Sequence, residues 1–505
     1  MKKIFAMLVT LIAVLEFGSA HGATTPGDLL VKFSPDQAVS YRNIMLKTLP
    51  AHSKIENLGL AGWHRVQVAK SSLFSFNLNI NAMSNMPGVL YVQPNYKIHL
   101  LEQPHMVEMR TKLAEYLAQH PEISDSGGGI PGVPSVPKID NPQIPDRPNP
   151  GHGDDPLFND QWGMIDIGVK KAWGKSPNTS DVIVAVIDTG VDYQHEDLIE
   201  NLWRNPGESG TDSQGRDKAT NGIDDDGNGY VDDVIGWDFV SNDNKPYDLA
   251  TDPIQLIMGG GNPGHGTHCA GNVAGRGQNG KGISGVAPNV SIMALRFISE
   301  KGEGTTADAV KALSYAVQNG ANITSNSWGS EGDDPNEPAD NKALHEAIQA
   351  CQDKGVLFVA AAGNGHQGVG YDNDTDPKPG FPASYAEDII VSVAAIDSKN
   401  HLGSFSNWGK ISVDIAAPGV QVFSTTVGSN YSDIVLDLFG MKVTWDGTSM
   451  ATPHVAGAAA LYLSQNPGAP WQQIKSALIR SATPLSDLTN KLVSGGKLNV
   501  EDLVQ

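Results

Sequence analysis

The chain has 505 residues, of which 40% are hydrophobic, and a formal net charge of −21. This length and apolar content allow one large core and a smaller unit, and they exclude disorder as the overall state. The negative charge argues against nucleic acid and against an anionic membrane surface as partners. Only two cysteines occur, so the fold cannot depend on a disulfide framework.

The N-terminus has the pattern of a secretory signal peptide. Two lysines precede an apolar run at residues 4–15, and small residues follow at 18–20. The run is about a dozen residues long, whereas a bilayer-spanning helix needs around 20. We therefore predict that residues 1–20 direct export and are removed, and that the protein is secreted to the medium or the periplasm.

Residues 24–100 have the pattern of a small α+β domain. Residues 29–33, 63–68 and 89–92 are predicted strands, with helix-like stretches between them. This segment carries seven bases and three acids, whereas the rest of the chain is strongly acidic. The opposite charges predict that the small domain docks on the acidic body.

Residues 101–154 connect this domain to the body. A short amphipathic helix, with Val107, Leu113 and Leu117 on one face, leads into a segment dense in Gly and Pro at 127–150. Such a composition is typical of an exposed linker that proteases can cut.

Strands alternate with helices throughout residues 155–505. Residues 182–187 and 356–361 are all-apolar runs, typical of parallel strands covered on both faces. Helices are predicted at 307–319 and 340–354, each followed by Gly. The alternation predicts an α/β fold with a doubly wound, mostly parallel sheet and a site at the carboxyl ends of its strands.

Three short motifs carry a candidate hydrolytic site. Asp188 ends the first apolar strand, His265 opens the run GHGTHCAG, and Ser449 lies in GTSMATPH, a small-residue turn before an apolar helix. A serine at a helix start is suited to attack a carbonyl when a histidine base and an orienting carboxylate accompany it. Alone, Ser449 or Thr452 would be only a helix cap.

Other hydrolase classes fit these motifs less well. An aspartic protease needs a second Asp-Thr-Gly motif, and the only similar triplet, Asp125-Ser126-Gly127, lies in the linker. A zinc protease needs His-Glu-x-x-His, but no glutamate lies between His265 and His268. An α/β-hydrolase would show Gly-x-Ser-x-Gly and the order Ser, Asp, His, and Ala451 fills the last glycine position here.

The order Asp188, His265, Ser449 and the three motifs resemble those of the subtilisin-like serine proteases. The resemblance covers residues 155–505 and implies that Asp188 orients the base, His265 takes the proton and Ser449 attacks. It also implies that residues 24–100 are an inhibitory propeptide, cut away in or near the linker when the zymogen processes itself.

The same resemblance assigns the other histidines and the oxyanion site. His268 and His454 are expected to be packed helical residues. Asn364 follows a buried strand and matches the family's oxyanion asparagine, which works with the backbone N–H of Ser449.

Two further sets of residues match the family's substrate cleft. The first set resembles edge segments that pair with an extended peptide: Gly302, Gly304, Ser327, Trp328 and Gly329. The second set matches the walls and floor of the primary pocket: Ala362, Gly363 and Gly380. Small pocket residues predict a preference for large apolar or aromatic residues on the acyl side. Four acids near the pocket loops leave a narrow-specificity processing protease as an alternative: Asp333, Asp334, Asp374 and Asp376. A non-catalytic binding protein on a protease scaffold is the rival from another class.

Acidic residues in the insertion between Asp188 and His265 predict a calcium site. Five residues fit positions 1, 3, 5, 7 and 9 of an EF-hand-type loop: Asp224, Asp226, Asn228, Tyr230 (through its carbonyl) and Asp232. The twelfth position is Ile235, so either Asp233 substitutes for the missing glutamate, the loop folds differently, or it is a solvated acidic loop. The family resemblance adds a tight calcium site at Asp155, Asp197 and Asn279, and a weaker cation site at Asp414.

The expected cofactor is therefore structural Ca²⁺. The expected partners are protein or peptide substrates and the chain's own propeptide, and we expect a monomer.

Overall fold

The computed structural model describes residues 27–35, 38–68, 76–101, 104–119, 140–142, 155–174, 181–252, 255–256, 260–329, 341–438 and 441–505. The signal-like residues 1–20, nearly all of the Gly/Pro-rich linker, and Asp333 and Asp334 lie outside the described residues. Among the described residues, no helix is long and apolar enough to cross a membrane.

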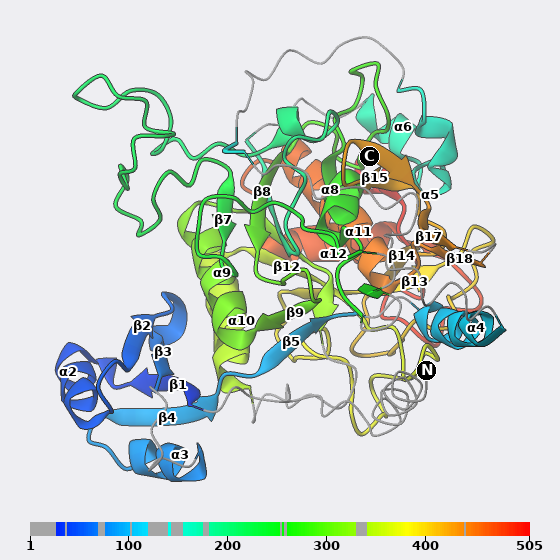
Figure 1. Cartoon of the computed structure of the whole chain (residues 1–505). Coiled ribbons are helices and arrows are strands. Elements are labelled where there is room, and N and C mark those ends of the chain that lie inside the picture. The colour runs from blue at the N-terminus through cyan, green and yellow to red at the C-terminus, as the bar shows by residue number, and fades with distance from the viewer. Residues whose placement is uncertain are drawn as a thin grey trace.

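The N-terminal unit is an antiparallel sheet with two helices and a core of its own (Figure 1). Alternate residues of the first strand, Leu29, Val31 and Phe33, contribute to this small core. Leu30 points to the other face, where it joins the core of the large body. The sheet order is β2-β3-β1-β4 and the elements are β1 (Asp28–Phe33), α2 (Ala38–Thr48), β2 (Lys54–Asn57), the 3₁₀ turn η2 (Leu60–Gly62), β3 (Trp63–Gln67), α3 (Phe76–Ser84) and β4 (Val89–Pro94).

The large body is built on a nine-stranded sheet, parallel except at the β19 edge, which confirms the predicted α/β fold. Strands β6 and β12 form from the two all-apolar runs. Their sequences are apolar because helices cover both faces of a parallel sheet, so that side chains on either face of the strand are buried. The strand order is β19-β20-β14-β13-β12-β10-β6-β8-β7, with bounds β6 (Ile183–Asp188), β7 (Gly236–Asp238), β8 (Ser291–Arg296), β10 (Ile323–Asn326), β12 (Leu357–Ala361), β13 (Ile390–Ile396), β14 (Ile415–Pro418), β19 (Thr483–Pro484) and β20 (Gly496–Lys497).

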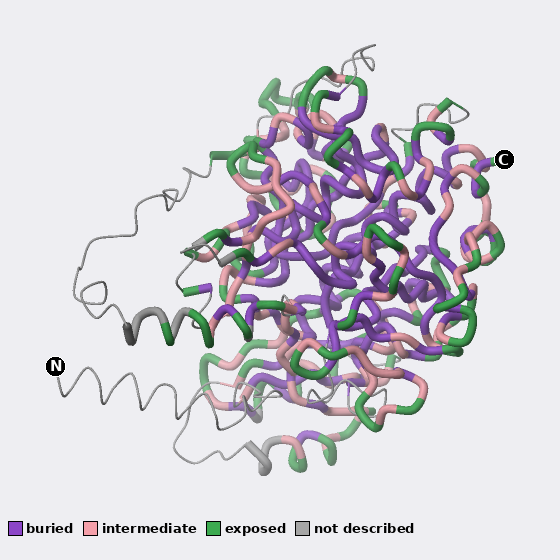
Figure 2. Tube along the Cα trace, turned by 90° about the vertical axis from the view of Figure 1, so that its right-hand side faces the viewer, coloured by how far each residue is buried: buried purple, intermediate pink, exposed green. Residues whose placement is uncertain are grey.

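Helices cover both faces of this sheet. Helices α8 (His265–Ala274) and α11 (Thr448–Gln465) pack against each other on one side, and α9 (Thr306–Gln318) and α10 (Lys342–Lys354) pack together on the other (Figure 1). Figure 2 shows the continuous buried core that results. Other elements are η3 (Phe158–Asp160), α5 (Trp162–Asp166), α6 (Val169–Trp173), η4 (Ile199–Asn201), β15 (Ser424–Thr426), β16 (Asn430–Ser432), β17 (Ile434–Leu438), β18 (Met441–Thr444), α12 (Trp471–Ser481) and α13 (Val500–Leu503).

The N-terminal unit docks on α9 and α10, as the opposite charges predicted. Lys32 Nζ lies 2.6 Å from Glu346, whose carboxylate also accepts a hydrogen bond from Trp63 Nε1 at 2.7 Å. Side-chain oxygens of the unit also accept from backbone N–H groups in the first turns of the two helices, Asn95 from Ala307 at 2.9 Å and Gln93 from Ala343 at 2.9 Å. The unit therefore satisfies helix-end donors that would otherwise be buried without partners.

The chain then enters the body as a strand. Strand β5 (Lys97–Leu100) lies between β9 (Glu303–Thr305) and β11 (Trp328–Gly329) and pairs antiparallel with both. Helix α4 (Met106–Gln119) follows and packs on the β17–β18 hairpin through a separate apolar cluster.

Candidate active site

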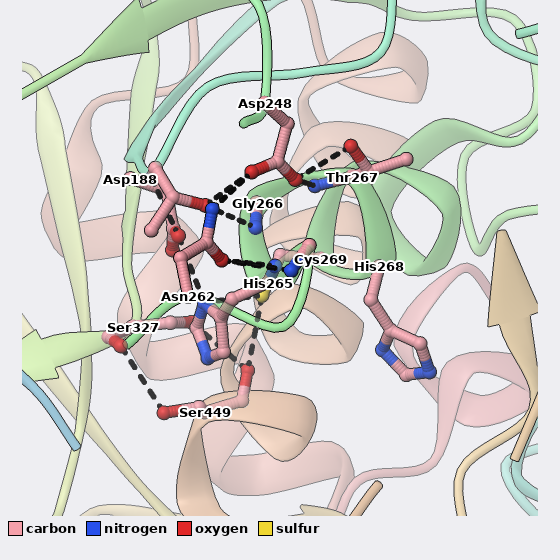
Figure 3. Close-up of polar contacts among 12 residues, drawn as sticks. Asp188, Asp248, Asn262, His265, Gly266, Thr267, His268, Cys269, Ser327 and Ser449 are labelled. Atoms are coloured by element: carbon pink, nitrogen blue, oxygen red, sulfur yellow. Dashed lines mark hydrogen bonds and ion pairs between the residues drawn. The ribbon is translucent and has the colours of Figure 1, made fainter. Parts of the chain in front are cut away.

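Asp188 and His265 form a buried pair at the carboxyl edge of the sheet (Figure 3). Asp188 is the last residue of β6, and His265 is the first residue of α8, where the preceding Gly264 has a left-handed φ of 94°. Their Nδ1 and Oδ1 atoms lie 2.8 Å apart. Burial is the largest single influence and lowers the pKa of His265, but the charge of Asp188, the neighbouring Cys269 and the hydrogen bonds to both together hold this pKa well above 6.5.

Ser449 lies beside this pair as the second residue of α11. Its hydroxyl donates to the carbonyl of Ser327 at 3.1 Å, while the buried Nε2 of His265 has no hydrogen-bond partner in the described part of the chain. In Figure 3 the His265 ring lies between Asp188 and Ser449. The serine hydroxyl and the ring nitrogen are thus neighbours that are not bonded in this arrangement.

Pro453 frees the carbonyl of Ser449 for contacts outside the helix. It is the sixth residue of α11, and it has no N–H to bond the carbonyl four residues back. That carbonyl instead accepts from Ser327 Oγ at 2.9 Å and from Cys269 Sγ at 3.5 Å. These contacts fix the start of α11, and Ser449 with it, against the β10–β11 connection and against α8.

Asp248, from the long insertion, is a site residue that sequence reasoning missed. Its fully buried carboxylate accepts from Thr189 Oγ1, Asn262 Nδ2 and both the N–H and hydroxyl of Thr267, at 2.6–2.9 Å. Asn262 in turn accepts from the backbone N–H of His265 at 2.9 Å. Burial, followed by the nearby charge of Asp188, raises the pKa of Asp248 to about 6.

No sequence motif marks Asp248, because it lies 14 residues before Asn262 in an irregular loop. Its contacts can be read only from the folded chain (Figure 3).

His268 and His454 are packed helical residues in this structure. The ring of His268 stacks on Trp445 with centroids 4.2 Å apart, and burial lowers its pKa to about 3. His454 bonds the carbonyl of Met450 at 2.8 Å, and burial lowers its pKa to about 4. Both rings are therefore neutral at ordinary pH and lie outside the Asp188–His265 pair.

Asn364 lies next to the start of α11. Its Oδ1 accepts from the backbone N–H of Thr448 at 2.9 Å and from the Thr448 hydroxyl at 3.0 Å. These bonds fix the amide so that Nδ2 faces Gly447, where an added Cβ would lie 3.2 Å away. The hydrogen bonds that Asn364 Oδ1 accepts from Thr448 thus set the orientation of the Nδ2 donor on the same side chain.

The two predicted edge segments flank an extended chain, which is β5 of this protein. On one side Leu100 pairs with Trp328 and His99 with Gly329. On the other side Ile98 pairs with Gly304, and the N–H of Leu100 donates to the carbonyl of Gly302 at 2.9 Å. Gly302, Gly304, Ser327, Trp328 and Gly329 therefore come together around one strand.

The predicted pocket residues lie together in a tightly packed stretch. An added Cβ would lie 2.4 Å from Asn407 Nδ2 at Gly363, where φ is 114°, and 2.8 Å from the Ala362 carbonyl at Gly380. The positive φ and the Asn407 side chain thus favour glycine at 363, and the neighbouring backbone favours glycine at 380. Asp374, one of the acids that left a narrow-specificity processing protease as an alternative, accepts hydrogen bonds from the backbone N–H groups of Ile411 and Ser412 at 2.8 and 2.9 Å.

Asp155, Asp197 and Asn279 come together as expected for the tight calcium site. Asn279 donates to Asp155 through its backbone N–H at 3.2 Å and to Asp197 through Nδ2 at 2.8 Å. Burial raises the pKa of both carboxyl groups. Two buried carboxylates with a neighbouring amide are oxygen donors of the kind that Ca²⁺ prefers.

The acidic insertion gains a carboxylate that the EF-hand pattern did not include. Glu208 is fully buried, its Oε1 accepts from the backbone of Asp225, and its Oε2 has no partner in the described ranges. Oxygens of Glu208, Asp224 and Asp226 all lie within 4.8 Å of one another. Burial raises the pKa of Glu208 to about 7. A buried carboxylate of Glu208 close to those of Asp224 and Asp226 is the arrangement expected of a cation-binding site.

Other predicted members of this loop are placed differently. Asp232 is turned toward Gly222 and accepts its N–H at 3.0 Å, and Asp233 bonds Asn205, Asn228 and the hydroxyl of Tyr315. Asp232 and Asp233 are thus committed to other partners, so the loop departs from the EF-hand pattern after its first half. The Tyr230 ring packs on Trp237, Phe239 and Tyr315.

Asp414 is paired with a lysine of the chain. Lys475 Nζ lies 3.1 Å from Asp414 Oδ1, and the other oxygen accepts from the backbone of Ser392 at 2.9 Å. The ammonium group supplies the positive charge expected of a cation there, so we leave Asp414 out of the metal ligands.

Comparison with known proteins places the chain among proteases. The model of the subtilase family matches residues 179–497. Thermitase of Thermoactinomyces vulgaris is 33% identical over 352 residues, which are 70% of this chain and 98% of thermitase. Subtilisin DY of Bacillus licheniformis is 38% identical over 242 residues, which are 48% of this chain and 78% of that protein.

A solved structure has a similar fold. Fervidolysin from Fervidobacterium pennivorans, described as a keratinolytic enzyme related to subtilisin, aligns with a TM-score of 0.63 at 23% identity. The alignment covers 95% of this chain and 61% of the fervidolysin chain. At this identity the likeness concerns the fold alone.

Proposed function

Because the chain belongs to the subtilase family of serine endopeptidases, we propose that Ser449 is its nucleophile, His265 its general base and Asp188 the group that orients the base. The observation that carries this assignment is the buried 2.8 Å contact between Asp188 and His265 beside the start of α11. Asp188 holds Nδ1 as the protonated nitrogen, which leaves Nε2 to take a proton.

The reaction requires one small rearrangement of Ser449. Its hydroxyl turns from the Ser327 carbonyl to His265 Nε2, which removes the proton as Oγ attacks the substrate carbonyl. The protonated ring then gives the proton to the leaving amine, and water hydrolyses the acyl-enzyme. Asn364 Nδ2 and the backbone N–H of Ser449 donate to the oxyanion, and the Thr448 bonds to Asn364 Oδ1 support this orientation.

Covalent labelling tests the assignment of the nucleophile. The processed protein is treated with a phosphonofluoridate, and the labelled peptide is mapped by mass spectrometry. We expect one adduct, on Ser449, and no adduct in a His265→Ala protein that an unrelated protease has freed of its N-terminal unit, because the hydroxyl is then not activated. An adduct on another residue of an active preparation would remove Ser449 from this role.

Substrates are proteins or peptides that bind as an added strand between β9 and β11, as β5 does. The main-chain pairing is indifferent to sequence, so preference comes from the pocket at Ala362, Gly363 and Gly380. We propose that this pocket prefers large apolar or aromatic residues on the acyl side. The carboxylate of Asp374 does not argue for a basic substrate residue, because it already accepts hydrogen bonds from backbone N–H groups. Cleavage of a peptide library mainly after Arg would favour a narrow processing protease instead.

The protein is made as a secreted zymogen in this proposal. Residues 1–20 are the signal peptide, 24–100 the inhibitory propeptide, 101–154 a helix and linker, and 155–505 the catalytic domain. The insertion of β5 into the substrate cleft supports inhibition, because no other strand can pair there while β5 is bound.

Structural calcium completes the proposal. Asp155, Asp197 and Asn279 form one site, and Glu208, Asp224 and Asp226 form the other, with Asn228 and the Tyr230 carbonyl as further donors from the same loop. Bound Ca²⁺ would neutralise carboxylates that the fold buries close together, and would so stabilise the folded state.

A further inference from the structure

The body has an apolar surface at the hairpin of β17 and β18, which α4 covers in this structure (Figure 1). Met106 and Met109 of α4, each 3% exposed, form one apolar cluster with Leu256, Leu436 and Val443. We call the last three residues the hairpin surface. Residues three apart lie on the same face of a helix. The hairpin surface therefore accepts two apolar side chains from one helix face.

The hairpin is joined directly to the candidate active site. Trp445 follows β18, and its N–H donates to the Asp433 carbonyl at 2.8 Å, which closes the base of the hairpin. Its ring stacks on His268 with centroids 4.2 Å apart and lies 6.4 Å from the ring of His265. The chain then enters α11, which carries Ser449. A segment bound at the hairpin surface is thus held in a fixed position relative to the nucleophile.

The hairpin surface lies on the side of the cleft from which the leaving amine departs. Ser449 lies at the carboxyl end of β5, because its hydroxyl donates to the carbonyl of Ser327, the residue before Trp328, and Trp328 pairs with Leu100. In a substrate that pairs as β5 does, the residues after the paired strand therefore belong to the amine that the reaction releases.

Contacts before α4 lead from the cleft to the hairpin. Pro104 lies against Gly368, because an added Cβ at Gly368 would lie 3.0 Å from the Pro104 carbonyl. His105 Nε2 lies 3.2 Å from Oδ2 of Asp446, the residue after Trp445. The hairpin surface is thus continuous with the cleft that β5 occupies.

Helix α4 fills the space beside the hairpin incompletely. Among the α4 side chains that the structure describes, only Met106 and Met109 are buried. A hollow of about 410 Å³ lies between helix and hairpin, with Lys112 on one side and Lys442 and Val443 on the other. A contact of this size leaves room for apolar side chains of other segments.

We propose that the hairpin surface is an exosite for protein substrates, which binds two apolar side chains, one helical turn apart, in the part of the substrate that leaves as the amine. This inference rests on the proposed function, since the exosite adds affinity to a substrate that Ser449 cuts. Helix α4 occupies the exosite in the full chain and leaves it with the N-terminal unit once the linker is cut.

The exosite selects substrates by a feature that the pocket cannot read. Main-chain pairing and the pocket act on the acyl side, whereas the hairpin surface acts on residues beyond the scissile bond. An amphipathic helix that lays its apolar face on such a surface binds through residues spaced as Met106 and Met109 are. Binding energy gained far from the reacting carbonyl raises kcat/KM for the longer substrate.

Two matched peptides test the exosite. Each has the acyl-side sequence Ala-Ala-Pro-Phe, a short Gly/Ser spacer and residues 104–119 of this chain, and the second carries Met106→Gln and Met109→Gln, since Gln is similar to Met in size and helix propensity. The protein is cut at a site for an unrelated protease inserted in the linker and separated from the N-terminal fragment. Cleavage after Phe is followed by mass spectrometry. We expect kcat/KM to be about tenfold higher for the peptide with Met.

Variants of the body locate the preference. Both peptides are compared on the same enzyme, so a loss of folded protein cancels in the ratio of the two kcat/KM values. Val443→Asp should bring this ratio close to one, and the milder Leu436→Ala should lower it in the same direction. Val443→Ile should keep it, as should Val493→Asp, a change at a valine that is 38% exposed.

The outcomes separate this inference from the proposed function. Equal kcat/KM values for the two peptides on the wild type would overturn the exosite, and so would a ratio that survives both Val443→Asp and Leu436→Ala. Recovery of the α4 fragment with the purified body would overturn it too, because the chain's own helix would then be the permanent occupant. All three results leave the protease assignment intact, whereas cleavage of either peptide by Ser449→Ala would contradict that assignment.

Discussion

The substitution Glu346→Gln is the strongest single test of how the N-terminal unit binds to the body and inhibits it. Its carboxylate accepts from Lys32 Nζ at 2.6 Å and from the buried Trp63 Nε1 at 2.7 Å, and its side chain is 16% exposed. Hydrogen bonds to a charged group contribute roughly 1.5–3 kcal/mol each. Glu346→Gln keeps an oxygen for one donor but removes the charge from both, so we expect a loss of about 2–3 kcal/mol in binding. At ~1.4 kcal/mol per factor of ten, this weakens inhibition by about 30- to 150-fold.

The assay compares body variants against one preparation of the N-terminal unit, recovered from the self-cut complex. Because the same unit is added to every enzyme, the free energy of folding the unit cancels in the ratio of inhibition constants. Glu501→Gln is the matched control, since Glu501 also pairs with a lysine, Lys171, but within the body. A change below threefold for Glu346→Gln, or equal changes in both variants, would refute this reasoning.

Three further predictions concern the site and the metal ions. Asp188 and Cys269 together raise the pKa of His265 despite its burial, so kcat/KM should fall as the pH drops through a midpoint above 6.5, and Asp188→Asn should lower that midpoint. Asp248→Asn leaves one acceptor oxygen for four hydrogen bonds, and should lower the free energy of unfolding by about 2–4 kcal/mol in urea titrations of the inactive Ser449→Ala protein. Chelation should lower the Tm, and Glu208→Gln should reduce the Tm increase that added Ca²⁺ produces.

Each of these has its own control and contrary outcome. A wild-type midpoint below 6.5 would contradict the first. For the second, Asp502→Asn changes an exposed carboxylate, and a cost no larger than that of this control would show that Asp248 does not organise the site. For the third, Glu300→Gln is the control, and a Tm unaffected by excess chelator would argue against structural calcium.

The sequence predicted what depends on local pattern. All-apolar strands, helices ending at Gly and the three motifs located Asp188, His265 and Ser449, because the carboxyl ends of parallel strands meet at one edge. Asp248 and Glu208 were not predicted, since both act from irregular loops of the insertion and their partners are brought close only by folding. Asp232 was placed in the calcium loop by spacing, yet its left-handed φ of 52° accompanies a bond to Gly222 instead.

The register of β5 was beyond sequence reasoning for a similar reason. Pairing of a short strand with two edges depends on where the N-terminal unit docks, and docking depends on contacts such as Lys32 to Glu346. Sequence alone therefore placed the processing cut in or near the linker, without a residue.

Ser449→Ala tests the central claim most directly. A site for an unrelated protease is inserted in the linker, and the cut N-terminal unit is separated from the wild type and from the variant before the assay, so that a blocked cleft cannot explain lost activity. Ser464→Ala, a buried serine of the same helix, is the matched control. We expect Ser449→Ala to keep its fold by circular dichroism while casein hydrolysis falls to background, and Ser464→Ala to remain active. A folded Ser449→Ala protein that still hydrolyses casein would contradict the account.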